Sequence, residues 1–362
     1  DPQIQNWMKN TTKELRKYID EYNQYFERNN KLSQEKKTQL DPLPRLILIP
    51  GVGLIGLGND KKSSIVAADI GQAWVETLLS AKSIGDFKPV SEKDTFELEY
   101  WSLEQAKLGK KKEPSLKGNV VVITGAGGAI GSNIAKEFKL AGAEVVAIDK
   151  DKNAANLTAK NCGGNSLGIC CDITNNSQLE KAFDQIVNTF GGIDILVSNA
   201  GAAWEGSISN MNESIFRQSM ELNLFAHYYA SKKAIAIFHS QDYFEINKKN
   251  IIGGQILFNI SKQALNPGPN FGSYGISKAA LLALMRQISL EEGQNKIRAN
   301  GINADRIRSG LLDSEMIKNR SKSRGISESD YMSGNLLKSE VLATDVAKAF
   351  VALADMEKTT GA

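Results

Sequence analysis

Tyr274 and Lys278 lie four residues apart in the segment Tyr-Gly-Ile-Ser-Lys. In a helix this spacing places the phenol and the ammonium on one face, one turn apart. A phenol has an ordinary pKa of about 10 and is a poor base at neutral pH, but a nearby ammonium favours the phenolate and should lower that pKa. The pair therefore predicts a group that gives a proton to a carbonyl oxygen or takes one from an alcohol.

A glycine-rich segment, residues 124–131, precedes that pair in the chain. Gly125 can adopt a tight turn, and Gly131 allows the following helix to begin close to the sheet. Free backbone N–H groups and the positive end of the helix dipole would then face a pyrophosphate. The turn follows a predicted strand, 119–123, which favours a dinucleotide site.

Asp149 ends the next predicted strand, 144–148. Its carboxylate can accept from both ribose hydroxyls and would repel a 2′-phosphate, so the sequence favours NAD over NADP as cofactor. Lys150 beside it keeps NADP open, and a plain turn acid is the simpler alternative for Asp149 itself.

Composition excludes several classes of function. The 362 residues are 41% hydrophobic and 23% charged, which is typical of a globular protein. A net charge of +3, from 44 basic and 41 acidic side chains, gives no electrostatic case for nucleic acid or an anionic membrane. No apolar run approaches the ~20 residues of a membrane span, and no signal peptide is recognised.

Histidine and cysteine are too few and too scattered for a metal site. His227 and His239 are the two histidines, and no cysteine or acid has ligand spacing to them. We expect Cys162, Cys170 and Cys171 to be small buried hydrophobes rather than a disulfide framework, which points to the cytoplasm. We therefore predict no metal.

The first third of the chain has a different pattern of predicted helices and strands from the rest. Apolar residues at helical spacing, from Ile4, Trp7 and Met8 onward, predict an amphipathic helix over 1–28 that packs on its own domain or on a sister subunit. Residues 29–44 resemble a linker, 45–50 a strand, 51–58 a glycine-rich loop and 63–82 a helix. Residues 51–56 match GxGxxG, but no second strand ending in an acid follows, so we favour a structural strand-to-helix turn there.

From residue 119, short apolar strands alternate with helices. Strands are predicted at 119–123, 144–148, 167–171, 193–197, 255–259 and 297–302, and helices at 129–142, 176–190, 212–240 and 273–292. This alternation predicts an α/β fold, a Rossmann-type doubly wound parallel sheet with a small N-terminal α/β extension. We expect three parts: a helix and linker at 1–40, the extension at 41–117, and a dinucleotide-binding domain at 118–362. Both ends of the chain look cut.

The order of these motifs resembles the short-chain dehydrogenase/reductase family over residues 118–361, about two thirds of the chain. Residues 124–131 look like the family's TGxxxGxG turn, with Ala129 where the middle glycine usually lies. The resemblance implies that Asp172 contacts the adenine and that residues 199–201 close the cofactor site. The residues implied at the cofactor are Thr124, Gly125, Gly127, Ala129, Ile130, Gly131, Asp149, Asp172, Ile173, Asn199, Ala200, Gly201, Tyr274, Lys278 and Ser309.

The same resemblance implies a catalytic set, Asn223, Ser261, Tyr274 and Lys278. Ser261, 13 residues before Tyr274, would hydrogen-bond the substrate oxygen and position it. Lys278 would also bind the nicotinamide ribose, and Asn223 would hold a water that links Lys278 to solvent. The hydride belongs to the cofactor.

Two departures from the family pattern concern the substrate side. Residues 304–309 replace the usual Pro-Gly after the sixth strand, with Ser309 where a threonine usually contacts the carboxamide. Lys262, Arg306 and Arg308 could bring positive charge to a substrate that carries phosphate or carboxylate, or they could be solvated loop cations. The final strand expected after Gly361, which helps to build the subunit interface in the family, is absent from this sequence. We expect a homodimer through the helices of Asn223 and Tyr274, or a homotetramer.

Two stretches in the first third, 44–58 and 99–109, resemble the connecting region of bifunctional proteins that join a class II aldolase to a short-chain dehydrogenase. That resemblance implies a small sugar-derived, polyol or hydroxyaldehyde substrate. The aldolase's zinc histidines have no counterpart here, so we expect the first third to be structural. The alternatives are a non-catalytic dinucleotide-binding sensor or scaffold, and the dehydrogenase part of a bifunctional sugar-phosphate aldolase/dehydrogenase.

Overall fold

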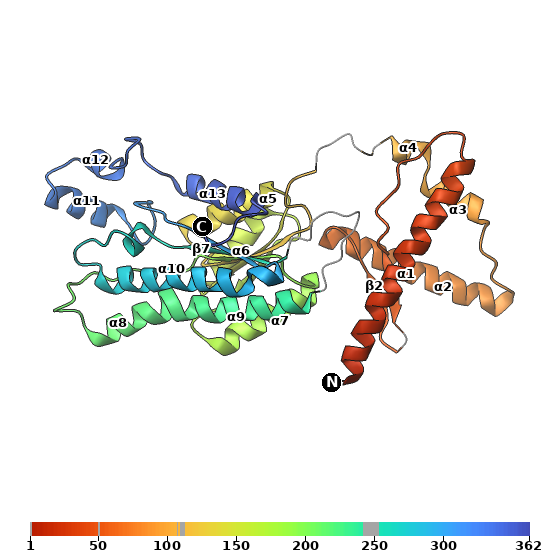
Figure 1. Ribbon diagram of the computed structural model, residues 1–362, viewed down its shortest axis with the longest axis horizontal. Helices are drawn as coiled ribbons and strands as arrows, with labels where there is room; N and C mark the ends of the chain where they lie inside the picture. The colour runs from red at the N-terminus through yellow and green to blue at the C-terminus, as the bar shows by residue number, and fades with distance from the viewer. Residues whose placement is uncertain (1, 50, 107, 109–112, 242–252) are drawn as a thin grey trace. The chain divides into compact units, whose positions relative to one another are not determined.

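The computed structural model describes residues 2–49, 51–106, 108, 113–241 and 253–362. The chain divides into two compact units, Asp1–Glu113 and Pro114–Ala362 (Figure 1). No helix in the described residues is long and apolar enough to cross a membrane. Pro50, residues 107 and 109–112, and the side chains of Ile4, Trp7 and Met8 lie outside what the structure describes.

An aromatic cluster organises the helices of the first unit. Helix α1 (Pro2–Leu32) extends beyond the predicted 1–28 and packs on α3 (Glu92–Glu99), which α4 (Ser102–Gln105) follows. Phe26, Phe96 and Tyr100 are buried between them, with the Phe96 and Tyr100 rings stacked at 4.7 Å. The last third of α1 therefore packs within its own unit, which is one of the two predicted arrangements.

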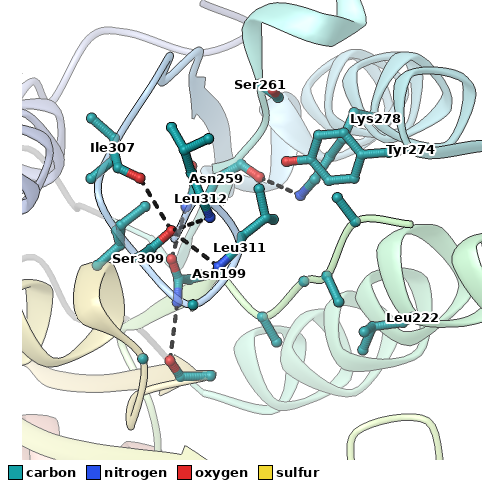
Figure 2. A pocket seen from close by; sticks show the side chains of 18 of the residues that line it. Asn199, Leu222, Asn259, Ser261, Tyr274, Lys278, Ile307, Ser309, Leu311 and Leu312 are labelled. Carbon is teal, nitrogen blue, oxygen red and sulfur yellow. Dashed lines mark hydrogen bonds between the residues drawn. The ribbon is translucent and has the colours of Figure 1, made fainter. Parts of the chain in front are cut away.

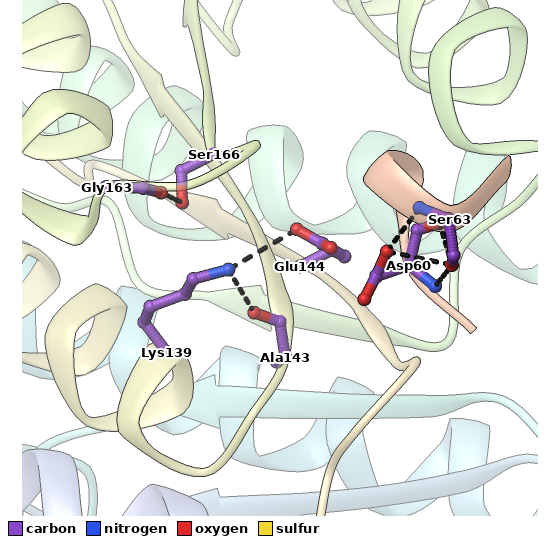
Figure 3. A network of polar contacts seen from close by, with 7 residues as sticks. All are labelled: Asp60, Ser63, Lys139, Ala143, Glu144, Gly163 and Ser166. Carbon is purple, nitrogen blue, oxygen red and sulfur yellow. Dashed lines mark hydrogen bonds and ion pairs between the residues drawn. The ribbon is translucent and has the colours of Figure 1, made fainter. Parts of the chain in front are cut away.

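The glycine-rich segment of the first unit forms a hairpin, and the prediction of a loop over 51–58 was wrong. Strands β1 (Leu46–Ile49) and β2 (Gly53–Gly56) pair antiparallel, because Gly51, with φ of +77°, reverses the chain. Helix α2 (Lys61–Ile84) then begins at a capping box in which Asp60 Oδ1 accepts from the Ser63 N–H at 2.7 Å (Figure 3). A Cβ on Gly56 would lie 2.2 Å from the Ser64 carbonyl oxygen, so this glycine serves close packing.

A six-stranded parallel sheet forms the centre of the second unit, with strand order β5-β4-β3-β6-β7-β8. The order reverses between β3 and β6, and an open α/β sheet binds ligands at such a switch point, beyond the carboxyl ends of its strands. The predicted α/β class with a Rossmann-type sheet is confirmed. The strands are β3 (Val120–Thr124), β4 (Glu144–Asp149), β5 (Leu167–Cys170), β6 (Ile195–Ser198), β7 (Gln255–Asn259) and β8 (Arg298–Ile302).

Helices cover both faces of this sheet because its strands are apolar on both sides. Val120 and Val122 face one layer, and Val121 and Ile123 face the other, all buried. Figure 1 shows α5 and α13 above the sheet and α7, α9 and α10 below it. The helices are α5 (Ala129–Leu140), α6 (Lys152–Cys162) and α13 (Ala343–Asp355) on one face, and α7 (Asn176–Phe190), α9 (Ala226–Ser240) and α10 (Gly272–Glu292) on the other.

A lysine fixes the crossover from α5 to β4. Lys139 Nζ donates to the Ala143 carbonyl at 3.2 Å and pairs with Glu144 at 3.4 Å, as Figure 3 shows. A cation near the last turn of a helix also interacts favourably with the helix dipole. Lys139 thereby links the end of α5 to the first residue of β4.

The helix predicted over 212–240 is interrupted. It consists of α8 (Glu213–Met220), a π-helical turn (Glu221–Phe225) and α9. The Ala226 N–H donates to the Glu221 carbonyl, five residues back, instead of four. One residue is thereby inserted into the helix, and such insertions occur mostly at functional sites.

After β8 the chain forms a small satellite layer. Helices α11 (Ser314–Ser323) and α12 (Glu328–Met332) enclose Leu312, Ile317 and Tyr331. The last residues then lie along β8, with the Gly361 N–H donating to the Ala299 carbonyl at 2.8 Å.

Candidate functional site

A cavity of about 870 Å³ lies beyond the carboxyl ends of the strands of the second unit. Most of the predicted site residues line it, among them Asn199, Ser261 and Tyr274 (Figure 2), whereas Thr124, Gly127 and Asn223 do not. The predicted residues that line it are Gly125, Ala129, Ile130, Gly131, Asp149, Asp172, Ile173, Asn199, Ala200, Gly201, Ser261, Tyr274, Lys278 and Ser309.

The glycine-rich turn leaves no room for side chains at two positions. Gly125 has φ of +64°, and a Cβ there would lie 2.7 Å from the Cα of Ala200. A Cβ on Gly131 would lie 2.2 Å from the Gly125 carbonyl oxygen. The first turn of α5 is therefore packed directly on the loop, as the sequence predicts, and its N–H groups face the cavity.

Thr124 and Asn199 join the ends of three neighbouring strands. The Asn199 N–H donates to Thr124 Oγ1 at 2.9 Å, and its Nδ2 donates to the Thr124 carbonyl at 3.0 Å. Asn259 Nδ2 donates in turn to Asn199 Oδ1 at 2.9 Å. This network holds the floor of the cavity rigid across β3, β6 and β7.

The two predicted acids are already engaged by the backbone. Asp149 accepts from the Gly127 N–H at 2.9 Å and from the Asp151 N–H at 3.0 Å, one bond to each oxygen. Asp172 Oδ1 accepts from the N–H and the hydroxyl of Thr174. Both carboxylates are thereby held in fixed positions at the edge of the cavity.

Tyr274 and Lys278 lie side by side on the first turns of α10, with Ser261 at the end of β7 beside them (Figure 2). Lys278 Nζ is 5.8 Å from the centre of the Tyr274 ring and donates to the Asn259 carbonyl at 2.8 Å. Ser261 caps the short 3-10 turn Lys262–Ala264 by accepting from the Gln263 N–H. The predicted spacing does bring the hydroxyl, phenol and amine together at one end of the cavity.

Burial governs the protonation of this pair. It raises the pKa of the Tyr274 phenol above its usual range, and a hydrogen bond with Ser261 opposes this. Burial lowers the pKa of Lys278 to about 7. The prediction that the pKa of Tyr274 lies below its usual range is therefore wrong for this structure, because the desolvation of the buried phenol is the larger effect.

Asn223 lies in the π-helical turn and is fully buried. Its Nδ2 donates to the Ala202 carbonyl at 2.8 Å, and its Oδ1 accepts from the Ala202 N–H at 3.2 Å. The side chain therefore holds the loop after residues 199–201. That Asn223 also holds a water linked to Lys278 stays a prediction.

His227 has a role that the sequence reasoning missed. Its Nε2 lies 2.9 Å from the Ala200 carbonyl, which can only accept, so Nε2 carries the proton and Nδ1 accepts from the Ser198 hydroxyl at 2.6 Å. Burial, with a contribution from Lys278, lowers the pKa of His227 to about 3, so the ring is neutral. The sequence did offer a signal for this role, because His227 follows Asn223 by four residues, and residues at that spacing in a helix lie near each other.

The three cations expected near the substrate are paired with acids. Lys262 Nζ lies 3.1 Å from Asp305, and Arg308 Nε lies 2.6 Å from Glu340. Arg306 lies 3.7 Å from Asp305, and of the three it alone lines the cavity. The hypothesis that Lys262 and Arg308 meet an anionic substrate is therefore not supported.

Ser309 stabilises the loop that departs from the family pattern. Its Oγ donates to the Ile307 carbonyl at 3.2 Å and accepts from the Leu311 and Leu312 N–H groups at 3.3 Å each (Figure 2). The predicted hydroxyl thus lies at the cavity, within a tight turn.

No group of three or more His, Cys, Asp or Glu side chains in the described ranges could hold a metal ion. The three cysteines are free. Cys171 is buried, but Cys170 on β5 is exposed and Cys162 is half-buried, so the prediction that all three are buried was wrong.

Two family models match the chain. Residues 119–324 match the model for short chain dehydrogenases, and residues 1–108 match the model for the second domain of class II aldolases. The second match extends the resemblance seen in the connecting region to nearly the whole first unit. It also includes helix α1.

Several known proteins are similar to this chain. An uncharacterised oxidoreductase of Bacillus subtilis (strain 168) is 28% identical over 95% of this chain, which spans 50% of that relative. A 7alpha-hydroxysteroid dehydrogenase of Escherichia coli (strain K12) is 36% identical over 52% of this chain and 70% of its own. The crystal structure of a 3-ketoacyl-(acyl-carrier-protein) reductase from Brucella melitensis, complexed with NADH, is 28% identical, with a TM-score of 0.58 over 68% of this chain and 95% of its own.

Proposed function

The chain belongs to the short-chain dehydrogenase/reductase family, and from that membership we propose that it catalyses the NAD-dependent interconversion of an alcohol and a carbonyl. The observation that carries the proposal is the meeting of Ser261, Tyr274 and Lys278 at one end of the cavity that the glycine-rich turn lines. A group that exchanges a proton with oxygen and a loop suited to pyrophosphate thus share one enclosed space.

The residues around the cavity fit a dinucleotide. The loop carries glycines at 125, 127, 128 and 131, so backbone N–H groups can approach a pyrophosphate without side chains between them. Asp149 and Asp172 are held at the cavity edge, where ribose and adenine would lie. The cofactor supplies the hydride when bound.

Tyr274 acts in this proposal as the general acid of carbonyl reduction. Because burial raises its pKa, the phenol keeps its proton at neutral pH and can give it to the carbonyl oxygen. Ser261 donates to the same oxygen and positions it. Lys278 returns a proton to the site and binds the nicotinamide ribose, and the π-helical turn of Asn223 holds the water that connects Lys278 to solvent.

We assign NAD as the preferred cofactor because of Asp149. Its carboxylate would repel the 2′-phosphate of NADP, and two backbone N–H groups prevent it from moving aside. Lys150, which also lines the cavity, is the residue that would favour NADP.

For the substrate we propose a small sugar-derived compound, a polyol or a hydroxyaldehyde. The match of the first unit to a class II aldolase domain supports this assignment. A second support is the Bacillus subtilis relative, because 95% of this chain aligns with only 50% of that longer protein. In that setting the chain is the dehydrogenase part of a bifunctional aldolase/dehydrogenase, working in the reducing cytoplasm. The first unit then has a structural role.

An assay of hydride transfer tests the function. The purified chain is mixed with NADH or NADPH and a panel of small hydroxyaldehydes, hydroxyketones and sugar phosphates, and absorbance at 340 nm is followed. We expect turnover with at least one compound and a higher kcat/KM with NADH. Tight NADH binding without turnover of any compound would instead support the alternative of a non-catalytic sensor or scaffold.

We further propose that the protein is a homodimer or homotetramer through α8–α10. Phe225, Tyr228 and Ile276 each expose about two fifths of their surface there, and such apolar exposure favours an interface. Light scattering of the purified chain should give at least the mass of a dimer. A monomer at micromolar concentration would contradict this assignment.

A further inference from the structure

Arg320 on α11 lines the cavity beside the reactive end, and nothing in the sequence pattern pointed to it. Its guanidinium carbon lies 4.1 Å from the centre of the Phe271 ring. Phe271 in turn lies edge-on to Tyr274, with ring centres 6.3 Å apart. The Phe271 ring therefore lies between the Arg320 cation and the Tyr274 phenol.

The guanidinium of Arg320 has donor capacity to spare. Only 18% of the side chain is exposed, and its Nε is buried without a hydrogen-bond partner among the described residues. A guanidinium keeps its charge at any ordinary pH, so this donor cannot be removed by deprotonation. An unpaired buried donor is costly and favours a ligand that accepts from it.

The partner of Arg320 is weakly held. Nη2 pairs with Glu205, whose side chain is half exposed, and ion pairs with exposed carboxylates contribute little to stability because water competes. The segment that carries Glu205 is anchored at the next residue, where the Gly206 N–H donates to the Asn270 carbonyl. Arg320 is thus paired with a carboxylate that water already reaches.

Other cations at the cavity lack this freedom. Arg306 donates to the Tyr331 carbonyl, lies over the Tyr331 ring and contacts Asp305. Arg217 is exposed and holds Glu213 in the same helix through two nitrogen atoms. Of these three arginines in the described lining of the cavity, Arg320 is the one that combines burial, a free donor and an aromatic surface beside Tyr274.

We propose that Arg320 is the specificity residue that binds an oxyanion substituent, a carboxylate or a phosphate, on the substrate. This inference rests on the proposed function and adds the substrate's charge to it. The planar guanidinium would make paired hydrogen bonds to two oxygens of the substituent, displacing Glu205, while Phe271 keeps the plane in place. The Phe271 ring lies between the Arg320 guanidinium and Tyr274, so the oxyanion would bind on the far side of this ring from the phenol.

Matched pairs of carbonyl compounds test the proposal. Glyceraldehyde 3-phosphate is compared with glyceraldehyde, and glyoxylate with glycolaldehyde, by the ratio of their kcat/KM values with NADH. In Arg320→Gln the anionic-to-neutral ratio should fall about tenfold to a hundredfold, the range expected for losing a charged hydrogen bond. Glu205→Gln should raise the ratio, because it removes the competing carboxylate.

Arg324→Gln is the control, since this arginine lies over Tyr331 in the same helical layer and does not line the cavity. An unchanged ratio in Arg320→Gln, with neutral substrates still reduced, would refute the inference and leave the proposed function standing. If Arg320→Gln does not fold, Glu205→Gln decides. An anionic-to-neutral ratio of kcat/KM that falls or stays constant in Glu205→Gln would also refute the inference.

A binding arm keeps the test independent of turnover. Calorimetric titration of inorganic phosphate, with NADH saturating, should show binding to the wild-type chain that Arg320→Gln loses. Phosphate that binds both proteins equally, or neither, would contradict the role of Arg320 even where no compound of the panel is reduced.

Discussion

The protonation of Tyr274 depends on two opposing physical effects at the same few atoms. A nearby ammonium favours the phenolate, whereas burial favours the neutral phenol. In this structure burial prevails for both partners, since it raises the pKa of Tyr274 and lowers that of Lys278 to about 7. In the reaction that we propose, a phenol that keeps its proton at neutral pH is suited to donate it to a carbonyl oxygen.

Lys278 should make the second unit less stable at low pH. Its pKa falls from 10.5 to about 7 on folding, so below pH 7 the native state has to hold a buried charge, and stability rises as pH increases from 7 to 10.5. Lys278→Met removes this cost and should stabilise the unit by about 2–4 kcal/mol at pH 6, with the gain disappearing near pH 10. Calorimetric melting between these pH values measures the difference.

The matching control is Lys262→Met, because Lys262 is partly exposed and pairs with Asp305. It should give no gain that depends on pH in this way. A Lys278→Met protein that is less stable than the wild type at pH 6 would show that the amine is not desolvated in the native state.

Sequence spacing was sufficient for the residues that share a helix or follow a strand. Tyr274 and Lys278 share one helical face, and Ser261 lies at the strand end that precedes them, so local geometry brings them to the cavity. Arg320 and Glu205 could not be found in this way, because the distance of 115 residues between them is closed only by tertiary packing. The direction of the Tyr274 pKa also depended on burial, which spacing does not report.

At the scale of elements, the glycine-rich turn gives the sharpest contrast between two neighbouring glycines. A Cβ on Gly131 would meet the Gly125 carbonyl oxygen at 2.2 Å, whereas one on Gly128 would have its nearest contact, with the same oxygen, at 3.4 Å. Gly131→Ala must push α5 away from the loop and should weaken NADH binding about tenfold or more, with a loss of about 1–3 kcal/mol in stability. Fluorescence titration with NADH and a melting curve measure both.

Gly128→Ala is the matched control, because Gly128 has φ of −74° and needs no left-handed backbone. It should change the melting temperature little. Equal losses of stability in the two variants would mean that the close approach of α5 to the loop is not what requires a glycine at 131.

Element types were more predictable than element boundaries and interruptions. The alternation of apolar strands and helices was enough for the parallel sheet, because both of its faces must be covered. The π-helical turn at 221–225 could not be predicted, since the 3.6-residue pattern continues through it, and the hairpin at Gly51 resembled a loop because its strands are four residues long. Helix α6, which Asp151 caps, was missed entirely.

At the scale of the whole molecule, every residue of the candidate site belongs to the second unit, Pro114–Ala362. The first unit matches a class II aldolase domain, and the described residues that line the cavity all have numbers above 113. The three-part division at residues 40 and 117 stays a proposal beside the two units of the structure. Chemistry at Tyr274 can thus be tested without reference to the role of residues 1–113.

Tyr274→Phe in the full chain tests the central claim most directly, because it removes one hydroxyl from a buried ring that Phe can replace. With the best substrate of the panel, kcat should fall about 10²–10⁴-fold, the range for loss of a general acid. The Kd for NADH should stay within about twofold of the wild-type value, a change in binding free energy well below the 1.4 kcal/mol that corresponds to about tenfold. A variant that binds NADH and turns over at a rate near that of the wild type would contradict the account.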